Sequence, residues 1–203
     1  MGIERRPDLK DYWSSRRVFS QSFAAKYMTR NRFVQILNSL HFVDTSNADK
    51  SDRLSKIDAV VKILKRAFAE VYKPGREVCI DESMIPFRGR VLFRQYLRGK
   101  RYKYGLKLYK LCSDDGYIVR FIVYASKEPS RTGSAAEYVV TKLMEPYLDS
   151  GRQLVTDNFY TSIPLAENLL QRRTHLVGTL RKNRVGIPKD ITSAKLQRGE
   201  TTA

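Results

Sequence analysis

The stretch Glu77-Val-Cys-Ile-Asp81 has the composition of a short β-strand that ends on an acidic residue. A second stretch, Gln153-Leu-Val-Thr-Asp157, has the same form. The carboxyl ends of strands form the edge at which α/β folds place their sites. If the two strands are neighbours in one sheet, the carboxylates of Asp81 and Asp157 converge although they lie far apart in the sequence.

The residues around these two strands predict the rest of an α/β domain. Ser113-Asp-Asp-Gly116 is a hairpin turn, because Asp-Gly tolerates the positive φ values of a tight turn. Helices are expected to begin at Ser134, which opens a capping box with Glu137, and at Ser162. The resulting order is that of a ribonuclease-H-like α/β domain, a mixed sheet flanked by helices in which the first and fourth strands lie side by side. The hairpin strands and the last strand are expected over residues 103–112, 117–125 and 175–180.

The first part of the chain is helical in pattern. One helix is expected from Thr29, because apolar residues recur from Phe33 to Leu40 at helical spacing. A second is expected over residues 55–72, before the break at Pro74-Gly75. We therefore expect a helical region over residues 1–75 and the α/β core over residues 76–203.

The charge of the chain narrows the choice of partner. The sequence has 38 Lys and Arg residues against 21 Asp and Glu, a formal net charge of +17. Nucleic acid is the usual partner of such a protein, because each neutralised phosphate releases condensed counterions. A solubility effect and an acidic membrane surface are weaker interpretations, and no stretch has the ~20 apolar residues that span a bilayer. We expect DNA, and no membrane, as the partner.

The two acids suggest a cation site, with a simpler alternative beside it. Two carboxylates held close together repel unless a cation lies between them, and hard oxygen ligands suit Mg²⁺. The alternative is that Asp81 and Asp157 merely end their strands, where Asp is common in turns. Zinc is not indicated, because Cys79 and Cys112 lie in apolar runs and no cluster of His and Cys residues is present.

Basic residues are concentrated after Asp81. No acidic residue occurs from Phe87 to Lys110, and aromatic residues are interleaved with the basic ones. Basic side chains can contact phosphates while aromatic rings stack on bases or pack inward. We expect the aromatic residues beyond Lys103 to belong to the core. The candidate DNA-binding residues of this segment are Arg88, Arg90, Arg94, Arg98, Lys100 and Arg101.

A second basic set flanks the last predicted strand. It could face a nucleic-acid backbone, or its members could cap the carboxyl end of the preceding helix. The set comprises Arg172, Arg173, Arg181, Lys182 and Arg184.

Two long motifs resemble those of piggyBac-type DDE transposases. Asp81-Glu-Ser-Met-Ile-Pro-Phe-Arg-Gly-Arg90 is similar to the first catalytic motif of that family, and Asp157-Asn-Phe-Tyr-Thr-Ser-Ile-Pro-Leu-Ala166 to the second. Shorter matches follow the family's order, so that the resemblance extends over residues 8–190. They are Asp11-Tyr-Trp-Ser, Met28-Thr-Arg-Asn-Arg-Phe33, Lys103-Tyr-Gly-Leu-Lys107 and Val177-Gly-Thr-Leu-Arg181.

The resemblance implies a function and a set of roles. The family cuts and pastes DNA with three aspartates and Mg²⁺, in a ribonuclease-H-like core behind a helical dimerisation and DNA-binding region. Asp81 matches its first aspartate and Asp157 its second, both as catalytic residues and metal ligands. Arg181, Lys182 and Arg184 match basic residues that the family places near target DNA. DNA as partner, homodimer formation and a nuclear location are the corresponding expectations.

One departure from the family pattern changes the expected activity. The family's third aspartate lies downstream of the last shared strand, and the acids after Asp157 are Glu167, Asp190 and Glu200, none of which lies in the family's third motif. A site that lacks one ligand holds its metal weakly, so we expect little or no cleavage by these residues alone. Three hypotheses remain: a transposase, a non-enzymatic DNA-binding protein derived from one, and a general basic nucleic-acid-binding domain with incidental aspartates.

Overall fold

The computed structural model describes residues 4–19, 22–44, 46, 51–99, 102–125, 133–193 and 197–201. It divides into two compact units, residues 1–48 and residues 49–203. Among the described residues, no helix combines the length and the apolar character that crossing a membrane requires.

The first unit is built from short helices held together by aromatic side chains. It contains η1 (Leu9–Trp13), α1 (Ala24–Tyr27) and α2 (Arg30–Asn38), and α2 begins as expected after Thr29, whose hydroxyl accepts a hydrogen bond from the Arg32 N–H. The Trp13 indole donates to the carbonyl of Met28 at 2.7 Å, and its ring lies 5.3 Å from that of Phe33. The Trp13 side chain thus joins η1 to α2.

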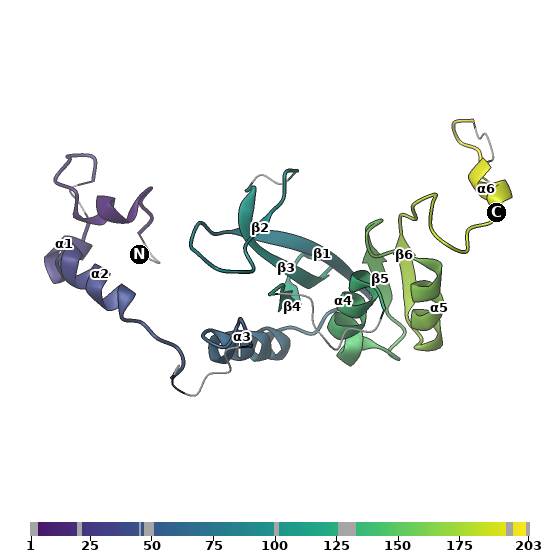
Figure 1. The fold of residues 1–203 in the computed structure, drawn as a ribbon, viewed down its shortest axis with the longest axis horizontal. Helices are drawn as coiled ribbons and strands as arrows, with labels where there is room; N and C mark the ends of the chain where they lie inside the picture. The colour runs from purple at the N-terminus through teal and green to yellow at the C-terminus, as the bar shows by residue number, and fades with distance from the viewer. Residues whose placement is uncertain are drawn as a thin grey trace. The chain divides into compact units, whose positions relative to one another are not determined.

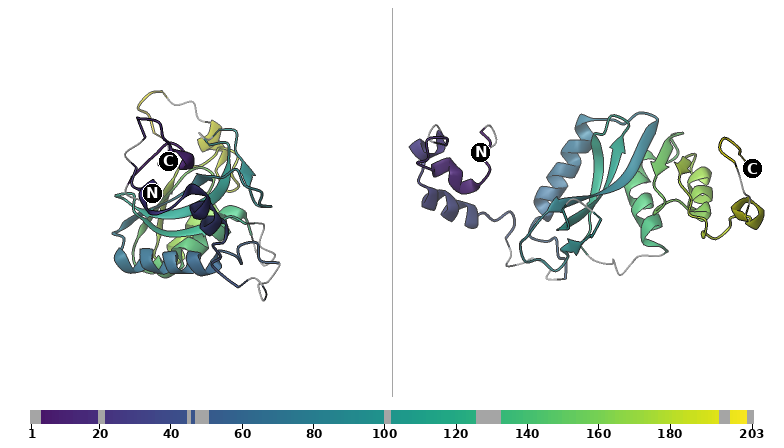
Figure 2. Two further views of the ribbon diagram at one scale, coloured as in Figure 1. Left: turned by 90° about the vertical axis from the view of Figure 1, so that its left-hand side faces the viewer. Right: turned by 90° about the horizontal axis from the view of Figure 1, so that it is seen from above.

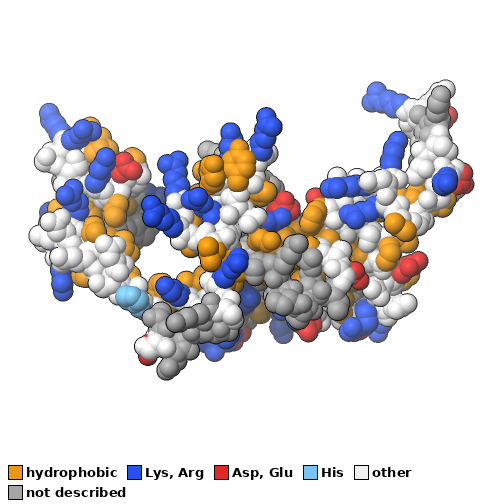
Figure 3. Space-filling view, in the orientation of Figure 1, with side chains coloured by type: hydrophobic (Ala, Val, Ile, Leu, Met, Phe, Trp, Pro, Cys, Tyr) orange, Lys and Arg blue, Asp and Glu red, His pale blue; other side chains and the backbone are white. Residues whose placement is uncertain are grey.

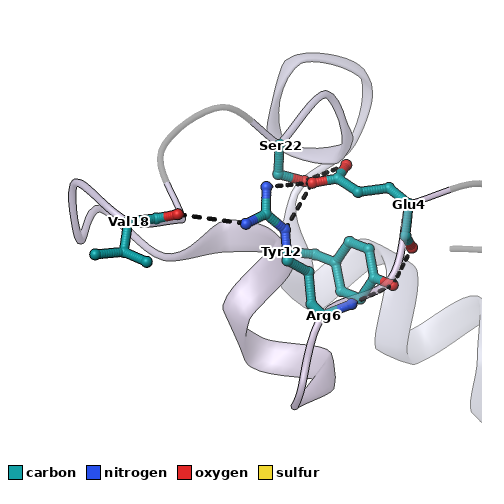
Figure 4. Close-up of polar contacts among 5 residues, drawn as sticks. All are labelled: Glu4, Arg6, Tyr12, Val18 and Ser22. Atoms are coloured by element: carbon teal, nitrogen blue, oxygen red, sulfur yellow. Dashed lines mark hydrogen bonds and ion pairs between the residues drawn. The ribbon is translucent and has the colours of Figure 1, made fainter.

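A polar cluster closes the same unit (Figure 4). Glu4 forms an ion pair with Arg6 and accepts a hydrogen bond from the Ser22 hydroxyl at 3.2 Å. The buried Tyr12 hydroxyl donates to the carbonyl of Glu4 and accepts from the Arg6 N–H at 3.2 Å. Arg6 also donates to the carbonyl of Val18. So short a segment cannot form a large apolar core, and these polar contacts stabilise it in addition to the aromatic ones.

The second unit contains a six-stranded mixed sheet (Figure 1). The order is β2-β3-β1-β5-β6, with β4 paired to β3. β5 runs parallel to both β1 and β6, whereas the pairs that involve β3 are antiparallel. The first and fourth predicted strands are therefore neighbours, and the ribonuclease-H-like fold expected from the sequence is confirmed. The strands are β1 (Glu77–Pro86), β2 (Gln95–Tyr96), β3 (Tyr104–Ser113), β4 (Ile118–Val123), β5 (Gln153–Thr156) and β6 (His175–Gly178).

Helices cover the sheet on both faces. α4 (Ala135–Met144), which continues into η3 (Glu145–Tyr147), and α5 (Ile163–Gln171) bury their apolar sides against Val78, Ile80 and Leu111. α3 (Asp58–Val71) packs on β4 from the opposite face, where the rings of Phe68 and Phe121 lie 5.9 Å apart (Figures 1 and 2). A short α6 (Lys189–Ser193) follows the sheet. α3 therefore belongs to the same compact unit as the sheet.

Two strands differ from their expected form. β1 continues five residues beyond Asp81, to Pro86, because β3 pairs with it along its whole second half. β2 has only two residues and no alternating apolar pattern, so it could not be predicted from the sequence. Asp81 consequently lies within a strand and not at its tip.

Candidate functional site

The register of β1 and β5 makes Asp81 and Asp157 neighbours. The paired positions run in parallel from Glu77 with Gln153 to Ile80 with Thr156, so Asp81 and Asp157 are the next two positions in line. Adjacent strands lie about 4.8 Å apart. Both side chains are exposed. The structure thus brings together two carboxylates that the sequence separates widely.

Strand alternation decides which way the first carboxylate faces. Val78 and Ile80 are buried under α4 and α5, so Asp81 projects from the other face of β1. Directly opposite Asp81 on β3 lies Lys110, and cross-strand partners share a face. Glu82 projects the other way, beside its buried cross-strand partner Tyr109.

The second carboxylate sits in a tightly bonded turn after β5. The Phe159 N–H donates to Asp157 Oδ1 at 3.0 Å. The Thr161 N–H and hydroxyl both donate to the Asp157 carbonyl, at 3.1 Å and 2.8 Å. Gly178 of β6 comes so close that a Cβ there would lie 2.3 Å from Thr161 Oγ1, which explains why glycine occupies this position. The turn therefore holds one oxygen of Asp157 in place.

Two neighbouring groups respond to both carboxylates. The pKa of the Cys79 thiol is raised, chiefly by burial and then by the negative charge of Asp81, with Asp157 contributing. Burial also raises the pKa of the Tyr160 hydroxyl, and Glu82, Asp157 and Asp81 add to the effect. Cys79 and Tyr160 are therefore neutral at neutral pH, and both lie close enough to the two carboxylates to be affected by their charge.

The carboxylate pair suits one hard divalent cation. Mg²⁺ is commonly bound by one or two carboxylates with water and substrate phosphate completing its shell. Within the described part of the chain, no group of three His, Cys, Asp or Glu side chains is gathered for a metal. The site thus offers two carboxylates to a cation, those of Asp81 and Asp157.

The predicted basic segment forms an exposed surface beside β1. Figure 3 shows Lys and Arg side chains gathered with hydrophobic ones over the end of the sheet formed by β2 and β3. Arg94 is held in place, because it donates to the carbonyls of Arg88 and Gly89 at 3.1 Å and 3.3 Å. Its guanidinium lies 5.4 Å from the centre of the Tyr104 ring. Arg88, Arg90, Arg94 and Arg98 are exposed, and Lys100 and Arg101 lie outside the described residues.

The aromatic residues of this segment divide into two groups. Tyr109 is buried in the core, as expected. Tyr104 is 53% exposed and its ring lies 4.9 Å from that of Tyr96, so the expectation that it belongs to the core is wrong. The physical reason is that Tyr104 begins β3, where only the two-residue β2 pairs with it. The pair of tyrosine rings is accessible to a partner.

The second basic set is largely engaged with the protein itself. Arg172 forms an ion pair with Asp149 at 2.5 Å, in which Nε and Nη2 of Arg172 both donate to the carboxylate. Arg181 donates to the side-chain carbonyl of Asn158, and Arg184 donates to the backbone after Asp157. Lys182 is exposed.

Three residues near the carboxylates were not proposed from the sequence. Lys110 was counted among the basic residues, but only the strand register places it opposite Asp81. Asn158 and Tyr160 lie one and three residues after Asp157, and this closeness in the sequence was the one indication that they belong to the site. Their contacts depend on β6 and on the core, which no local pattern reveals.

Comparison with known proteins places this geometry in a family. The family model described as Transposase IS4, of the DDE class, matches residues 1–203. Human PiggyBac transposable element-derived protein 3 is 27% identical over 202 residues, which cover 95% of this chain and 34% of the relative. Human PiggyBac transposable element-derived protein 2 is 24% identical over 204 residues, with the same coverage of 95% and 34%. The chain thus spans about a third of the length of these curated relatives.

A solved structure agrees with the sequence relatives. It is described as a cryo-EM structure of the piggyBac transposase synaptic complex with hairpin DNA. Its TM-score is 0.79 at 27% sequence identity, and the match covers 97% of this chain and 49% of the other. The chain therefore belongs to the DDE transposase family described as Transposase IS4, and it is of the piggyBac type.

Proposed function

We propose that this chain is a DNA-binding transposase domain that supplies two carboxylates of a divalent-cation site for DNA strand cleavage and strand transfer. The observation that carries the proposal is that Asp81 and Asp157 directly follow the last paired positions of two parallel neighbouring strands, beside an exposed basic hairpin. The similarity to a transposase in complex with hairpin DNA supports DNA as the partner.

The cation proposed for the site is Mg²⁺, held by Asp81 and Asp157. A bound divalent cation stabilises charge on the attacking and leaving oxygens of a phosphodiester displacement. The protein's own contribution is geometric. β1 presents Asp81, and the Phe159 N–H holds one oxygen of Asp157 at 3.0 Å.

The DNA-binding surface proposed for the chain is the β2–β3 hairpin with its preceding loop. Arginine side chains contact the phosphates, and the exposed rings of Tyr96 and Tyr104 offer a platform for an unpaired base. Arg94 stiffens this platform, because it is bonded to the loop and lies over Tyr104. The phosphate-contacting residues proposed are Arg88, Arg90, Arg98, Lys100 and Arg101.

The proposed activity of residues 1–203 alone is DNA binding with little or no cleavage, because two carboxylates hold a catalytic metal pair weakly. A nuclear location and homodimer formation through the helical region are further parts of the proposal. A domesticated, non-enzymatic DNA-binding protein is the alternative. That protein would use the basic hairpin in the same way and would have no use for the carboxylates.

Salt-dependent binding tests the proposed DNA surface. Affinity for a duplex DNA fragment is measured between 50 and 200 mM salt for the native chain and for Arg88→Ala with Arg98→Ala. Each lost phosphate contact should lower the salt slope by about 1, so the double variant should lose about 2. Lys142→Ala on α4 is the matched control and should change the slope little, because Lys142 lies outside the hairpin. If Lys142→Ala lowered the salt slope as much as the double variant, the DNA-binding surface would not be confined to the hairpin.

Cation binding separates the two proposed functions. Mn²⁺, which can be followed by its effect on water relaxation, is titrated into the native chain, Asp81→Asn and Asp157→Asn. Each substitution should weaken Mn²⁺ binding by at least about tenfold while metal-free DNA binding is retained. Asp190→Asn on α6 is the control that removes one exposed carboxylate elsewhere. Unchanged Mn²⁺ affinity in both site variants would refute the ligand assignment and favour the non-enzymatic function.

A further inference from the structure

The loop after β6 contacts the Asp157 turn through two arginines, and we propose that Arg181 and Arg184 are positioning residues that act on Asp157 through Asn158 and Phe159. This inference rests on the proposed function for the role of Asp157, and it gives these arginines a task other than contact with DNA phosphates. Lys182, between them in sequence, has no such contact among the described residues and is exposed.

Arg184 donates hydrogen bonds to the backbone of the turn after β5. Its Nη2 donates to the carbonyl of Asn158 at 3.0 Å and to the carbonyl of Phe159 at 2.7 Å. The side chain is half-buried, and hydrogen bonds donated by a charged group are stronger than those between neutral groups. Both bonds come from the same nitrogen, and the nitrogen of a lysine would lie one atom closer to the backbone on a flexible stem, so it could not reach the same point in the same side-chain conformation.

The same peptide group links Arg184 to the carboxylate. The Asn158 carbonyl and the Phe159 N–H belong to one peptide unit, and in a trans peptide they point in opposite directions. Arg184 holds the carbonyl, and the N–H on the other side donates to Asp157 Oδ1 at 3.0 Å. A cation on the carbonyl also polarises the peptide and strengthens the bond that its N–H donates. Arg184 therefore fixes the orientation of the Asp157 carboxylate through a single peptide.

Arg181 fixes the side chain of the intervening residue. Its Nε and Nη2 both donate to Asn158 Oδ1, at 3.1 Å and 3.0 Å. The Arg184 N–H donates to the Arg181 carbonyl at 3.0 Å, so the two arginines extend from one closed turn. The loop after β6 and the turn after β5 are thereby joined by four hydrogen bonds from two guanidinium groups.

Positioning and simple electrostatics predict opposite signs for cation binding. A positive charge near the carboxylates repels a divalent cation, so removal of Arg184 should strengthen cation binding if charge alone mattered. If Arg184 orients Asp157, its removal should weaken cation binding, because lost support of a metal ligand typically costs 10–100-fold in affinity. The sign of the change therefore distinguishes the two roles.

The experiment compares Arg184→Ala, Arg184→Lys and Lys182→Ala in the full chain. Mn²⁺ affinity and hydrogen exchange at the Phe159 amide are measured, with the Leu154 amide of buried β5 as the reference for global stability. We expect both Arg184 variants to weaken Mn²⁺ binding about tenfold or more and to accelerate exchange at Phe159 relative to Leu154. Lys182→Ala should leave both unchanged, because Lys182 makes no contact with the Asp157 turn among the described residues.

Three outcomes would overturn the inference. Tighter or unchanged Mn²⁺ binding in Arg184→Ala would show that Arg184 acts through its charge or stabilises the fold, and that it does not orient Asp157. Full rescue by Arg184→Lys would show that charge suffices. Unchanged relative exchange at Phe159 would show that the peptide does not depend on Arg184. If instead Asp157→Asn leaves Mn²⁺ affinity intact while Phe159 exchange still responds to Arg184, the proposed function fails and the positioning contact stands.

Discussion

Tyr160 shows how closely the apolar core approaches the two carboxylates. Its side chain is 1% exposed, and its ring packs edge-to-face on Phe159 and Tyr109, at 4.9 Å and 6.5 Å. The buried hydroxyl has no hydrogen-bond partner among the described residues. An unsatisfied buried hydroxyl costs about 1–3 kcal/mol, so the tyrosine is held by its ring and not by its oxygen.

Substitution at Tyr160 should separate these two contributions. Tyr160→Phe should leave the free energy of unfolding unchanged or raise it by up to about 1 kcal/mol, because it removes a buried donor without a partner. Tyr160→Ala is the comparison and should cost about 3–5 kcal/mol, since it leaves a cavity the size of a ring. Urea unfolding measures both. A loss of more than about 1 kcal/mol in Tyr160→Phe would mean that the hydroxyl is bonded in solution.

Single residues were predictable where the backbone pattern alone decided their place. The acids at 81 and 157 follow short apolar runs, and that pattern placed them on two strands of the α/β core, although Asp81 lies within β1 and only Asp157 follows the end of its strand. Asn158, Arg181 and Arg184 were a different case. Their hydrogen bonds join segments that are separated in the chain, so the sequence indicated basic character but not the partner.

At the scale of elements, the end of α5 is tied to the loop that precedes β5. Arg172 donates to both carboxylate oxygens of Asp149, and the Asp149 N–H donates to the Arg172 carbonyl at 2.8 Å. Asp149 adopts a positive φ of 61°, a conformation that Asp and Asn tolerate better than other residues with a Cβ. Arg172 holds the pKa of Asp149 below its ordinary value, chiefly by hydrogen bonding and then by its charge.

The pH dependence of stability should report on this tie. The folded-state pKa of Asp149 is lowered, so its contribution to stability is present above the unfolded-state pKa of about 3.9 and is lost as pH falls through the folded-state pKa. Asp149→Asn, which preserves the tolerance for positive φ, should therefore be less stable than the native chain near pH 7. The difference should shrink as pH falls through the folded-state pKa and should vanish once the carboxyl is protonated in the folded chain, and it should be small and salt-sensitive because the pair is exposed.

Urea unfolding across this pH range, at low and at high salt, provides the measurement. Arg172→Ala should follow the same pH profile as Asp149→Asn, because either change removes the ion pair. A stability difference that persists at pH 2 would place the effect in the backbone conformation and not in the ion pair.

The elements themselves were predictable to different degrees. α4 and α5 carry N-cap serines whose hydroxyls accept the expected backbone hydrogen bonds, so their starts follow from local chemistry. The length of β1 did not follow from local chemistry, because β3 extends it beyond the residues that pair with β5. β2 forms because its two residues pair with the beginning of β3.

At the scale of the whole molecule, the second unit begins before the sheet. Compositional change suggested a boundary near residue 75, whereas the compact unit extends from residue 49. The difference is α3, whose Phe68 packs between the rings of Tyr117 and Phe121, and whose Lys65 lies over the Phe121 ring at 5.7 Å. The Tyr72 hydroxyl also donates to Asp115 in the β3–β4 turn.

Two shortened chains should show which of the two boundaries, residue 49 or residue 76, yields a stably folded unit. Residues 49–203 should retain cooperative unfolding, because α3 still covers the outer face of β4. Residues 76–203 should lose several kcal/mol of stability and bind a dye for exposed apolar surface, because Phe121 on β4 and Tyr117 before it would face water. Circular dichroism and urea unfolding measure both. Equal stability of the two chains would show that α3 contributes little to the fold.

The sequence by itself determined the order of the strands other than β2 and of the helices α2 to α5, the fold class, the family resemblance and the identity of the two acids, because these depend on local composition and on motifs of contiguous residues. Only the tertiary structure decided that Asp81 and Asp157 are in register, that Tyr104 is exposed, and that Arg181 and Arg184 bond to the Asp157 turn. Strand register and side-chain contacts arise between segments distant in the chain, where no periodicity in the sequence specifies the partner.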